Sequence, residues 1–304
     1  MIWISMWDRI KVLLKSLVGE KNSLGAIWKL IYTTIGYASS LFTFAVLLND
    51  LIGFNKVEML CKRYWFVLII IAIIASVIYN HEKISFKRTM EDSDLQIVVK
   101  VTDLFAAKAS SYVIPTNTFF RTVMDGEYIS TESVQGTFQL KYFKNNTAEL
   151  DTLIAKSLLQ QGIEGKDSSD IHGLVKKYPI GTVAKVERKR KHYYFVAIND
   201  VNKFGKPENQ GYTNVDIALK ALLETINKLG HCDDLAMPLI GTGRAAIREA
   251  TIEKVIEDTI NRFVSSKNKI SRKLIICIRP KDFLDGKVNL EKIKKFVDYK
   301  CEFR

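Results

Sequence analysis

The chain has 304 residues, of which 47% are hydrophobic, so it can bury a sizeable core and is too apolar to be a disordered polymer. Its formal net charge is +12, with 11 Lys and Arg against 5 Asp and Glu in residues 1–90 and 34 against 28 in residues 91–304. Each part therefore carries a net charge of +6. The shorter part, which holds the apolar segments, has the higher net positive charge per residue. Basic residues beside apolar segments are typical of membrane proteins, so the charge does not indicate a nucleic-acid partner.

Residues 1–24 are predicted to form an amphipathic helix. Apolar side chains recur at steps of three or four residues, while most charged side chains lie elsewhere on the helix; the apolar positions are Trp3, Trp7, Ile10, Leu14 and Leu17. Such a helix, with tryptophans on its apolar side, suits the inner membrane interface. The alternative is a helix that packs against its own domain, and the sequence favours neither over the other.

Residues 25–90 are predicted to contain two transmembrane helices, at about 30–48 and 64–79, and neither range holds a charged residue. At 1.5 Å per residue the first range can cross a hydrocarbon core about 30 Å thick, and the second falls slightly short but has interfacial aromatic rings. The alternative is a pair of buried core helices. Up to residue 90, eight basic residues lie outside the two spans and three between them, the latter partly offset by Asp50 and Glu58. This bias predicts an inner-membrane protein with its N-terminus and its large C-terminal part in the cytoplasm.

Residues 91–304 are predicted to form an α/β domain. The predicted strands are 95–101, 112–115, 182–187, 192–198, 235–240 and 274–278. The predicted helices are 147–160, 214–229, 250–264 and 290–299. Because the later strands alternate with helices, we expect ligand chemistry at the carboxyl ends of the strands.

The basic run from Arg188 to Lys191 lies between two predicted strands. Its simplest interpretation is the solvated tip of a β-hairpin. Contact with anionic lipid or with the acidic face of a partner is the alternative.

The four cysteines, Cys61, Cys232, Cys277 and Cys301, form no CxxC pair and have no spacing typical of metal ligands. The four histidines are scattered singly, so no zinc site is predicted. We therefore expect reduced packing cysteines, as in a cytoplasmic domain, and neither a metal nor a cofactor.

The most informative segment is residues 235–247, where an apolar run ends in Gly241-Thr242-Gly243 and a helix-forming segment begins just beyond. A strand, a glycine loop and a helix N-terminus in this order point backbone N–H groups at a phosphate. The glycines let the backbone turn sharply and let an oxygen approach closely. Arg244 is a candidate counter-charge, although it can equally be a solvated loop residue.

Three segments of the last two-thirds of the chain resemble the macro domain, an α/β module that binds ADP-ribose. They are residues 101–105 (Val-Thr-Asp-Leu-Phe), 113–117 (Val-Ile-Pro-Thr-Asn) and 238–244 (Pro-Leu-Ile-Gly-Thr-Gly-Arg), of which the last is the most specific. The resemblance implies a mixed sheet flanked by helices. It further implies that Asp103 accepts the adenine amino group, that Asn117 lies near the distal ribose, and that residues 241–243 form the second phosphate loop.

The segment after Asn117 departs from the family pattern. Catalytic macro domains follow this Asn with a run of glycines, which is missing here, so the domain is predicted to bind its ligand without hydrolysing it. A variant pocket built by residues 119–136 is expected instead. The residues assigned to the ligand are Asp103, Leu104, Asn117, Ser133, Gln135, Gly136, Ile240, Gly241, Thr242, Gly243 and Arg244.

A variant macro domain behind two membrane spans resembles the membrane effector of type II Thoeris antiphage defence. In that family a partner TIR-domain enzyme makes an ADP-ribose conjugate, histidine–ADP-ribose, which the effector binds. The resemblance implies a homo-oligomer that assembles in membrane lipid, damages the membrane and kills the infected cell.

Three other interpretations stay open. The first is a membrane-tethered ADP-ribosyl hydrolase, against which the missing glycine run argues. The second is a nicotinamide-dinucleotide domain, because Gly241, Gly243 and Ala246 satisfy the pattern G-x-G-x-x-A. That pattern belongs in the first βα turn of its fold, whereas here it comes late and follows Pro238. The third is an anchored interaction protein with an empty pocket.

Overall fold

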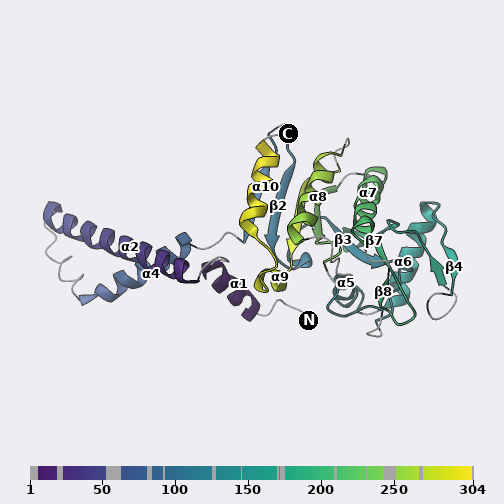
Figure 1. Cartoon of the computed structure of the whole chain (residues 1–304), viewed down its shortest axis with the longest axis horizontal. Coiled ribbons are helices and arrows are strands. Elements are labelled where there is room, and N and C mark those ends of the chain that lie inside the picture. The colour runs from purple at the N-terminus through teal and green to yellow at the C-terminus, as the bar shows by residue number, and fades with distance from the viewer. Residues whose placement is uncertain are drawn as a thin grey trace. The chain divides into compact units, whose positions relative to one another are not determined.

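The computed structural model describes the chain except for residues 1–5, 19–22, 53–62, 81–83, 92, 125–127, 145, 170, 172–174, 209–210, 231, 243–250, 267–269 and 303–304. The chain divides into two compact units, a helical unit of Ser5–Ile84 and an α/β unit that contains Ser85–Arg304. Figure 1 labels their elements in chain order.

The helical unit contains α1 (Met6–Val18), α2 (Ser23–Ile52) and α4 (Trp65–Asn80). Among the described residues one helical stretch, Trp28–Leu48 in α2, is long and apolar enough to cross a membrane, and none of it is buried within the chain. With 16 residues, α4 is apolar but shorter than the roughly 20 residues that a bilayer requires. The structure thus supports one candidate span, and the two-helix transmembrane hairpin stays a prediction.

Polar contacts join α2 to α4. The Ser76 hydroxyl, which is fully buried, donates to the Leu30 carbonyl at 3.1 Å and is hydrogen bonded to the Thr33 hydroxyl. Asn80 Nδ2 donates to Thr33 Oγ1 at 2.7 Å. Because a polar group in an apolar helix pair is costly unless it is hydrogen bonded, these contacts favour one relative register of the two helices.

The α/β unit is built on a single mixed sheet. Its strands are β1 (Ser85–Thr89), β2 (Gln96–Val101), β3 (Ser111–Asn117), β6 (Val183–Arg188), β7 (Lys191–Val201), β8 (Pro207–Glu208), β9 (Cys232–Pro238) and β10 (Ser271–Ile278). They follow the order β1-β2-β10-β9-β3-β7-β6, and β8 pairs with β7. The five strands from β2 to β7 in this order are parallel, whereas β1 and β6 are antiparallel to their neighbours. A separate ribbon is formed by β4 (Lys166–Ser168) and β5 (Val175–Lys177).

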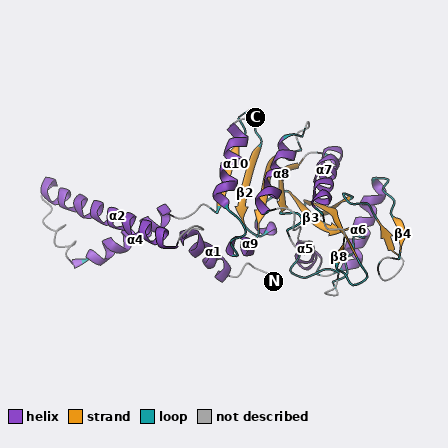
Figure 2. Cartoon of the chain, viewed as in Figure 1, coloured by secondary structure: helices purple, strands orange, loops and turns teal. Residues whose placement is uncertain are grey.

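Helices cover both faces of the sheet (Figure 2). They are η1 (Leu104–Ala106), α5 (Val134–Phe143), α6 (Thr147–Gln160), α7 (Tyr212–Leu229), α8 (Ile252–Val264), α9 (Pro280–Leu284) and α10 (Leu290–Glu302). The predicted α/β architecture, a mixed sheet flanked by helices, is therefore confirmed. The compact unit begins at Ser85, upstream of the expected start at residue 91, because β1 pairs with β2.

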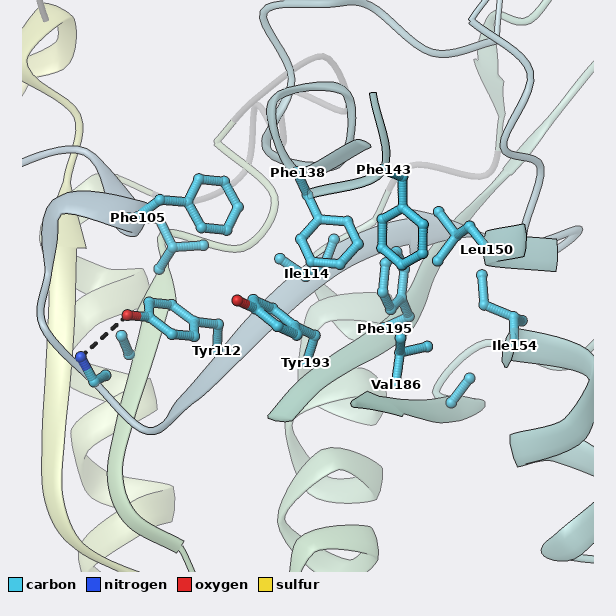
Figure 3. Packing of buried hydrophobic residues seen from close by; sticks show 14 of the residues in the cluster. Phe105, Tyr112, Ile114, Phe138, Phe143, Leu150, Ile154, Val186, Tyr193 and Phe195 are labelled. Carbon is cyan, nitrogen blue, oxygen red and sulfur yellow. Dashed lines mark hydrogen bonds between the residues drawn. The ribbon is translucent and has the colours of Figure 1, made fainter. Parts of the chain in front are cut away.

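The core between the sheet and helices α5 and α6 is unusually aromatic (Figure 3). Phe138 of α5 is fully buried, and its ring centroid lies 4.6 Å from that of Tyr193 and 5.3 Å from that of Phe195. Tyr112 of β3 stacks on Tyr193 of β7 at 5.4 Å. Aromatic pairs at these spacings stabilise the fold beyond the area that they bury, so α5 is held firmly over β3 and β7.

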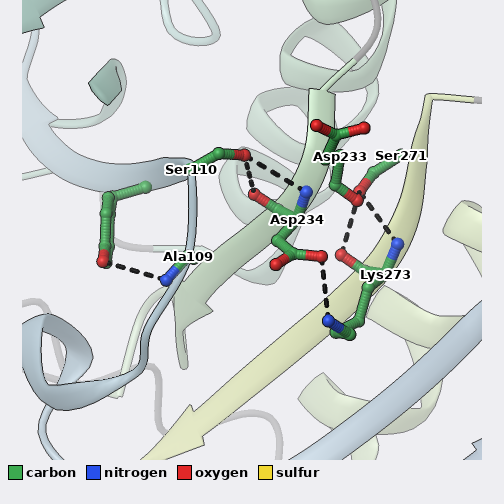
Figure 4. A network of polar contacts seen from close by, with 7 residues as sticks. Ala109, Ser110, Asp233, Asp234, Ser271 and Lys273 are labelled. Carbon is green, nitrogen blue, oxygen red and sulfur yellow. Dashed lines mark hydrogen bonds and ion pairs between the residues drawn. The ribbon is translucent and has the colours of Figure 1, made fainter. Parts of the chain in front are cut away.

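The amino ends of β3, β9 and β10 are joined by polar contacts (Figure 4). The Ser110 hydroxyl donates to the Asp234 carbonyl at 3.0 Å and accepts from the Asp234 N–H at 3.2 Å. On the other side of β9, Lys273 forms an ion pair with Asp234 at 3.0 Å. These contacts lie at the end of the sheet opposite to the carboxyl ends of the parallel strands.

Replacing Ser110 by Ala is expected to lower the free energy of unfolding by about 1–2 kcal/mol, because both backbone groups of Asp234 lose a partner. Urea denaturation of the full chain measures this. The matched variant is Ser93→Ala at an exposed turn, for which we expect less than about 0.5 kcal/mol. Equal losses of unfolding free energy in the two variants would show that the Ser110 hydrogen bonds stabilise the fold no more than an exposed turn contact does.

Candidate functional site

A cavity of about 450 Å³ lies at the carboxyl ends of the parallel strands. Its described lining comes from the ends of β3, β7, β9 and β10, from the loop before α5 and from α9. The carboxyl edge of a parallel sheet is where α/β folds bind ligands, as the alternating pattern of strands and helices predicted.

The loop after β9 forms one wall of the cavity. Pro238, Leu239, Gly241 and Thr242 line it. Gly241 has a φ of 83°, a left-handed conformation that favours glycine, and the Thr242 hydroxyl donates to the Leu239 carbonyl at 2.9 Å. The side chain of Ile240 is buried, and this residue does not line the cavity. The predicted ligand residues Gly243 and Arg244 lie outside the described residues.

A cation that the sequence analysis missed lies beside this loop. Arg279 follows β10 directly, and its Nη2 donates to the Thr242 carbonyl at 3.1 Å. The same guanidinium binds the Asp282 carboxylate twice, from Nε at 2.7 Å and from Nη2 at 3.0 Å. Asp282 is 2% exposed, whereas the Arg279 side chain is 45% exposed. The buried carboxylate thus fixes the orientation of a charged group that reaches the cavity, which Lys281 also lines.

The N-terminus of α5 also lines the cavity. Ser133 caps the helix by accepting from the Gly136 N–H at 2.9 Å, and it lines the cavity together with Val134 and Gln135. The Gln135 Nε2 donates to the Arg121 carbonyl at 2.8 Å. Gly136 does not line the cavity, and a Cβ at its position would lie 2.2 Å from the Ser130 carbonyl oxygen. Its observed role is therefore to let the loop cross close to the helix.

Asn117 is the last residue of β3 and lines the cavity. Its Oδ1 accepts from the N–H of Phe119 at 3.0 Å and of Arg121 at 3.3 Å, which turns the chain away from the sheet. Phe120 within this turn has a φ of 49°, which is uncommon for a residue with a side chain. Asn117, which is expected near the distal ribose, thus lines the cavity, and its side chain also shapes the following loop.

Asp103 and Leu104 do not line the described cavity. Asp103 caps η1, with its Oδ1 accepting from the Phe105 N–H at 2.9 Å. Leu104 is buried in the aromatic core. The resemblance to the macro domain implies that Asp103 contacts adenine. The structure shows a capping contact for this side chain, and the adenine contact stays a prediction.

The described residues were searched for a reactive thiol and for a metal site. Burial raises the pKa of the Cys277 thiol to about 12, and the thiol is therefore protonated and unreactive at neutral pH. Among the described residues no group of His, Cys, Asp and Glu side chains is arranged to hold a metal ion. The polar part of the cavity lining consists of hydroxyl and amide groups, the cations Arg279 and Lys281, and the carboxylate of Glu132.

A mixed sheet between helical layers, with a glycine loop, an oriented arginine and a helix N-terminus at one cavity, is the architecture of an α/β module of the macro type. The family model of the Thoeris protein ThsA macro domain matches residues 97–279. The chain belongs to this family.

Solved macrodomains resemble the chain at low identity. One from Oceanobacillus iheyensis with ADP is 12% identical and has a TM-score of 0.46, with 70% of this chain and 97% of that chain covered. The macrodomain of Mycobacterium tuberculosis DarG is 17% identical with a TM-score of 0.39, covering 60% and 97%. A Trypanosoma brucei macrodomain in complex with ADP-ribose is 8% identical with a TM-score of 0.41, covering 63% and 67%. A search of curated proteins gives no match.

Proposed function

We propose that the cavity binds a nucleotide of the ADP-ribose type and that this binding is the sensing step of a Thoeris defence effector. The observation that carries the proposal is the convergence of three anion-binding features on one cavity: the Gly241–Thr242 loop, the guanidinium of Arg279 and the N-terminus of α5. Each stabilises negative charge by itself, and together they suit a diphosphate.

The ligand that we propose is histidine–ADP-ribose, made by a partner TIR-domain enzyme. Membership in the Thoeris ThsA macro-domain family supports a signal nucleotide of this class. A volume of about 450 Å³ lies in the range of about 300–1,000 Å³ that is usual for small-molecule sites.

The proposed output is at the membrane. The exposed apolar stretch of α2 supports a spanning helix, and we propose that α4 completes a hairpin, with the N-terminus and the α/β unit in the cytoplasm and the protein in the inner membrane. A ligand shifts a receptor toward an assembled form only as far as it binds that form more tightly. We therefore propose that the signal favours a homo-oligomer, which disrupts the lipid bilayer.

We propose that the protein is a receptor and not an enzyme. The missing glycine run after Asn117 and the use of the Asn117 Oδ1 in shaping the loop support this. The competing function is ADP-ribosyl hydrolysis, which predicts release of ADP-ribose from a modified protein.

Calorimetric titration of the full chain in detergent micelles tests the proposal, with ADP-ribose, NAD and histidine–ADP-ribose as ligands. We expect tight binding of the conjugate, weaker binding of the other two, no turnover, and a larger particle by light scattering once the conjugate is bound. Absence of binding by all three would overturn the proposed function. Binding with an unchanged particle size would overturn the assembly step alone.

A further inference from the structure

A dense group of cations surrounds the turn between β6 and β7. Arg188 and Lys191 pair across these antiparallel strands, so the basic run between them is the tip of a hairpin. The basic surface consists of six described residues from this turn and from the C-terminal end of α5, namely Lys141, Lys144, Arg188, Lys189, Arg190 and Lys191. The cavity lies at the other end of β7, where Asn199 and Val201 line it, and none of these six residues does.

Aromatic rings lie beneath the basic surface. Four of the six cations have their charged group 4.6–6.0 Å from a ring centre: Lys141 and Lys189 over Tyr142, Arg188 over Phe143, and Lys191 over Tyr112. Tyr112 and Phe143 belong to the aromatic core (Figure 3), and Tyr142 packs against it. Because the rings are packed together and attract the cations, the positive charges are gathered on one compact surface.

Few carboxylates neutralise the basic surface. Arg188 forms an ion pair with Glu149. None of the ion pairs between described residues involves the other five cations, and four of these five are exposed. Glu187, which precedes Arg188, contacts Lys185 and His192 instead. The surface therefore presents a net positive charge to the solvent.

The lysines of the basic surface differ from the cation that lines the cavity. Arg279 is oriented by the buried carboxylate of Asp282, which suits one bound anion in a fixed position. A lysine without a carboxylate partner is a compact point charge on a flexible stem. Several such charges side by side suit an extended layer of anions.

The tip of the hairpin keeps its charge at a conformational cost. Lys189 has a φ of 51° and Arg190 a φ of 59°, so both lie in the left-handed region. A two-residue hairpin turn with two positive φ values favours Asn and Gly, whereas other residues adopt this conformation less readily. The chain thus carries two cations where a neutral pair would fit the backbone better, which indicates a role for the charge itself.

We propose that the basic surface binds the anionic headgroups of the cytoplasmic membrane leaflet. The proposal rests on the proposed membrane attachment, because a chain held in the bilayer by α2 keeps this surface at a high effective concentration beside the lipid. Groups of roughly four to eight Lys and Arg residues next to a membrane attract anionic lipids in this way. Since the cavity lies at the other end of β7, this contact leaves the cavity open to its ligand.

The test compares the full chain in phosphatidylcholine nanodiscs with and without phosphatidylglycerol. Lysines are acylated with a water-soluble ester, and mass spectrometry gives a rate for each. We expect Lys141, Lys144 and Lys189 to react at least about threefold more slowly in the anionic discs. This protection should disappear at about 1 M salt, where the Debye length is only about 3 Å. Lys220 and Lys228 of α7, which are exposed and lie outside the basic surface, are expected to react equally in both discs.

A double variant separates the charge of the turn from its shape. Lys189→Asn with Arg190→Gly introduces the pair that the backbone conformation favours, so we expect a melting temperature no lower than that of the wild type. We also expect the protection of Lys141 in anionic discs to fall by at least about half, because two of the six cations are gone. Unchanged protection of Lys141 in this variant would overturn the contact of the turn with lipid.

The remaining outcomes separate this inference from the proposed function. Equal acylation rates in the two kinds of disc, for a chain that is incorporated in both, overturn the lipid contact and leave the acidic face of a protein as the partner. A chain that does not enter the discs overturns the proposed membrane output and the lipid contact with it. Nucleotide binding is measured separately by titration and is affected by neither result.

Discussion

The double variant Arg279→Gln with Asp282→Asn is expected to bind ADP-ribose at least about tenfold more weakly than the wild type, because a hydrogen bond to a charged group contributes about 1.5–3 kcal/mol. Arg279 is the cation that Asp282 orients and that also contacts the Thr242 carbonyl of the glycine loop. Both residues are changed together because Arg279→Ala alone would leave a carboxylate that is 2% exposed without its cation. Calorimetric titration measures the affinity.

The control for this variant removes an equal pair of charges at the opposite end of the sheet. Lys273→Gln with Asp234→Asn breaks the ion pair at the amino ends of β9 and β10, far from the cavity. We expect it to leave the affinity unchanged. Wild-type affinity in the Arg279/Asp282 variant would mean that the guanidinium does not contact the ligand.

Gly136→Ala is expected to lower the free energy of unfolding by about 3 kcal/mol, at the upper end of the cost of overpacking, and to abolish ligand binding. The new Cβ would lie 2.2 Å from the Ser130 carbonyl oxygen, so the loop before α5 must move away from the helix. Ser133, which caps α5 and lines the cavity, would move with it. Thermal denaturation and titration measure the two effects.

Gly211→Ala is the matched variant, because a Cβ at Gly211 has no atom within 4 Å. We expect a change of less than about 0.5 kcal/mol in stability and no change in binding. A Gly136→Ala protein that binds ligand normally would show that the close approach of Ser130 is not needed for the site.

The strands and helices that could be predicted from the sequence are those with a strong apolar pattern. The strand 274–278 and the helix 147–160 are both present, as β10 and α6. The segment Ser85–Thr89 was missed because it is an edge strand with one buried residue, so its polar sequence resembles a linker. Helix α5 was missed because it holds a glycine, a threonine and three aromatic residues, all of which have a lower helix propensity than Ala or Leu.

The same limit applies to the site. Asn117, Ser133, Gln135, Gly241 and Thr242 were assigned from local motifs, and the structure brings all five to one cavity. Arg279 could not be assigned to the site from a local motif. Its contact with the glycine loop depends on β10 lying next to β9, and no local pattern encodes this long-range pairing. Its position directly after a predicted strand was the available signal, since ligands bind at carboxyl ends of strands. Tyr128 likewise reaches the cavity through an irregular loop without a recognisable pattern.

The place of β10 in the sheet determines when a newly made chain can complete the fold of its α/β unit. This last strand pairs with β2 on one side and β9 on the other, with Lys273 opposite both Gln96 and Asp234. Until the ribosome has made it, β1 and β2 have no partner in the rest of the sheet, and pairings between distant segments form slowly. Translation therefore yields the apolar helices first and the complete α/β unit last, so products of premature termination before residue 271 would carry the helices without a finished cavity.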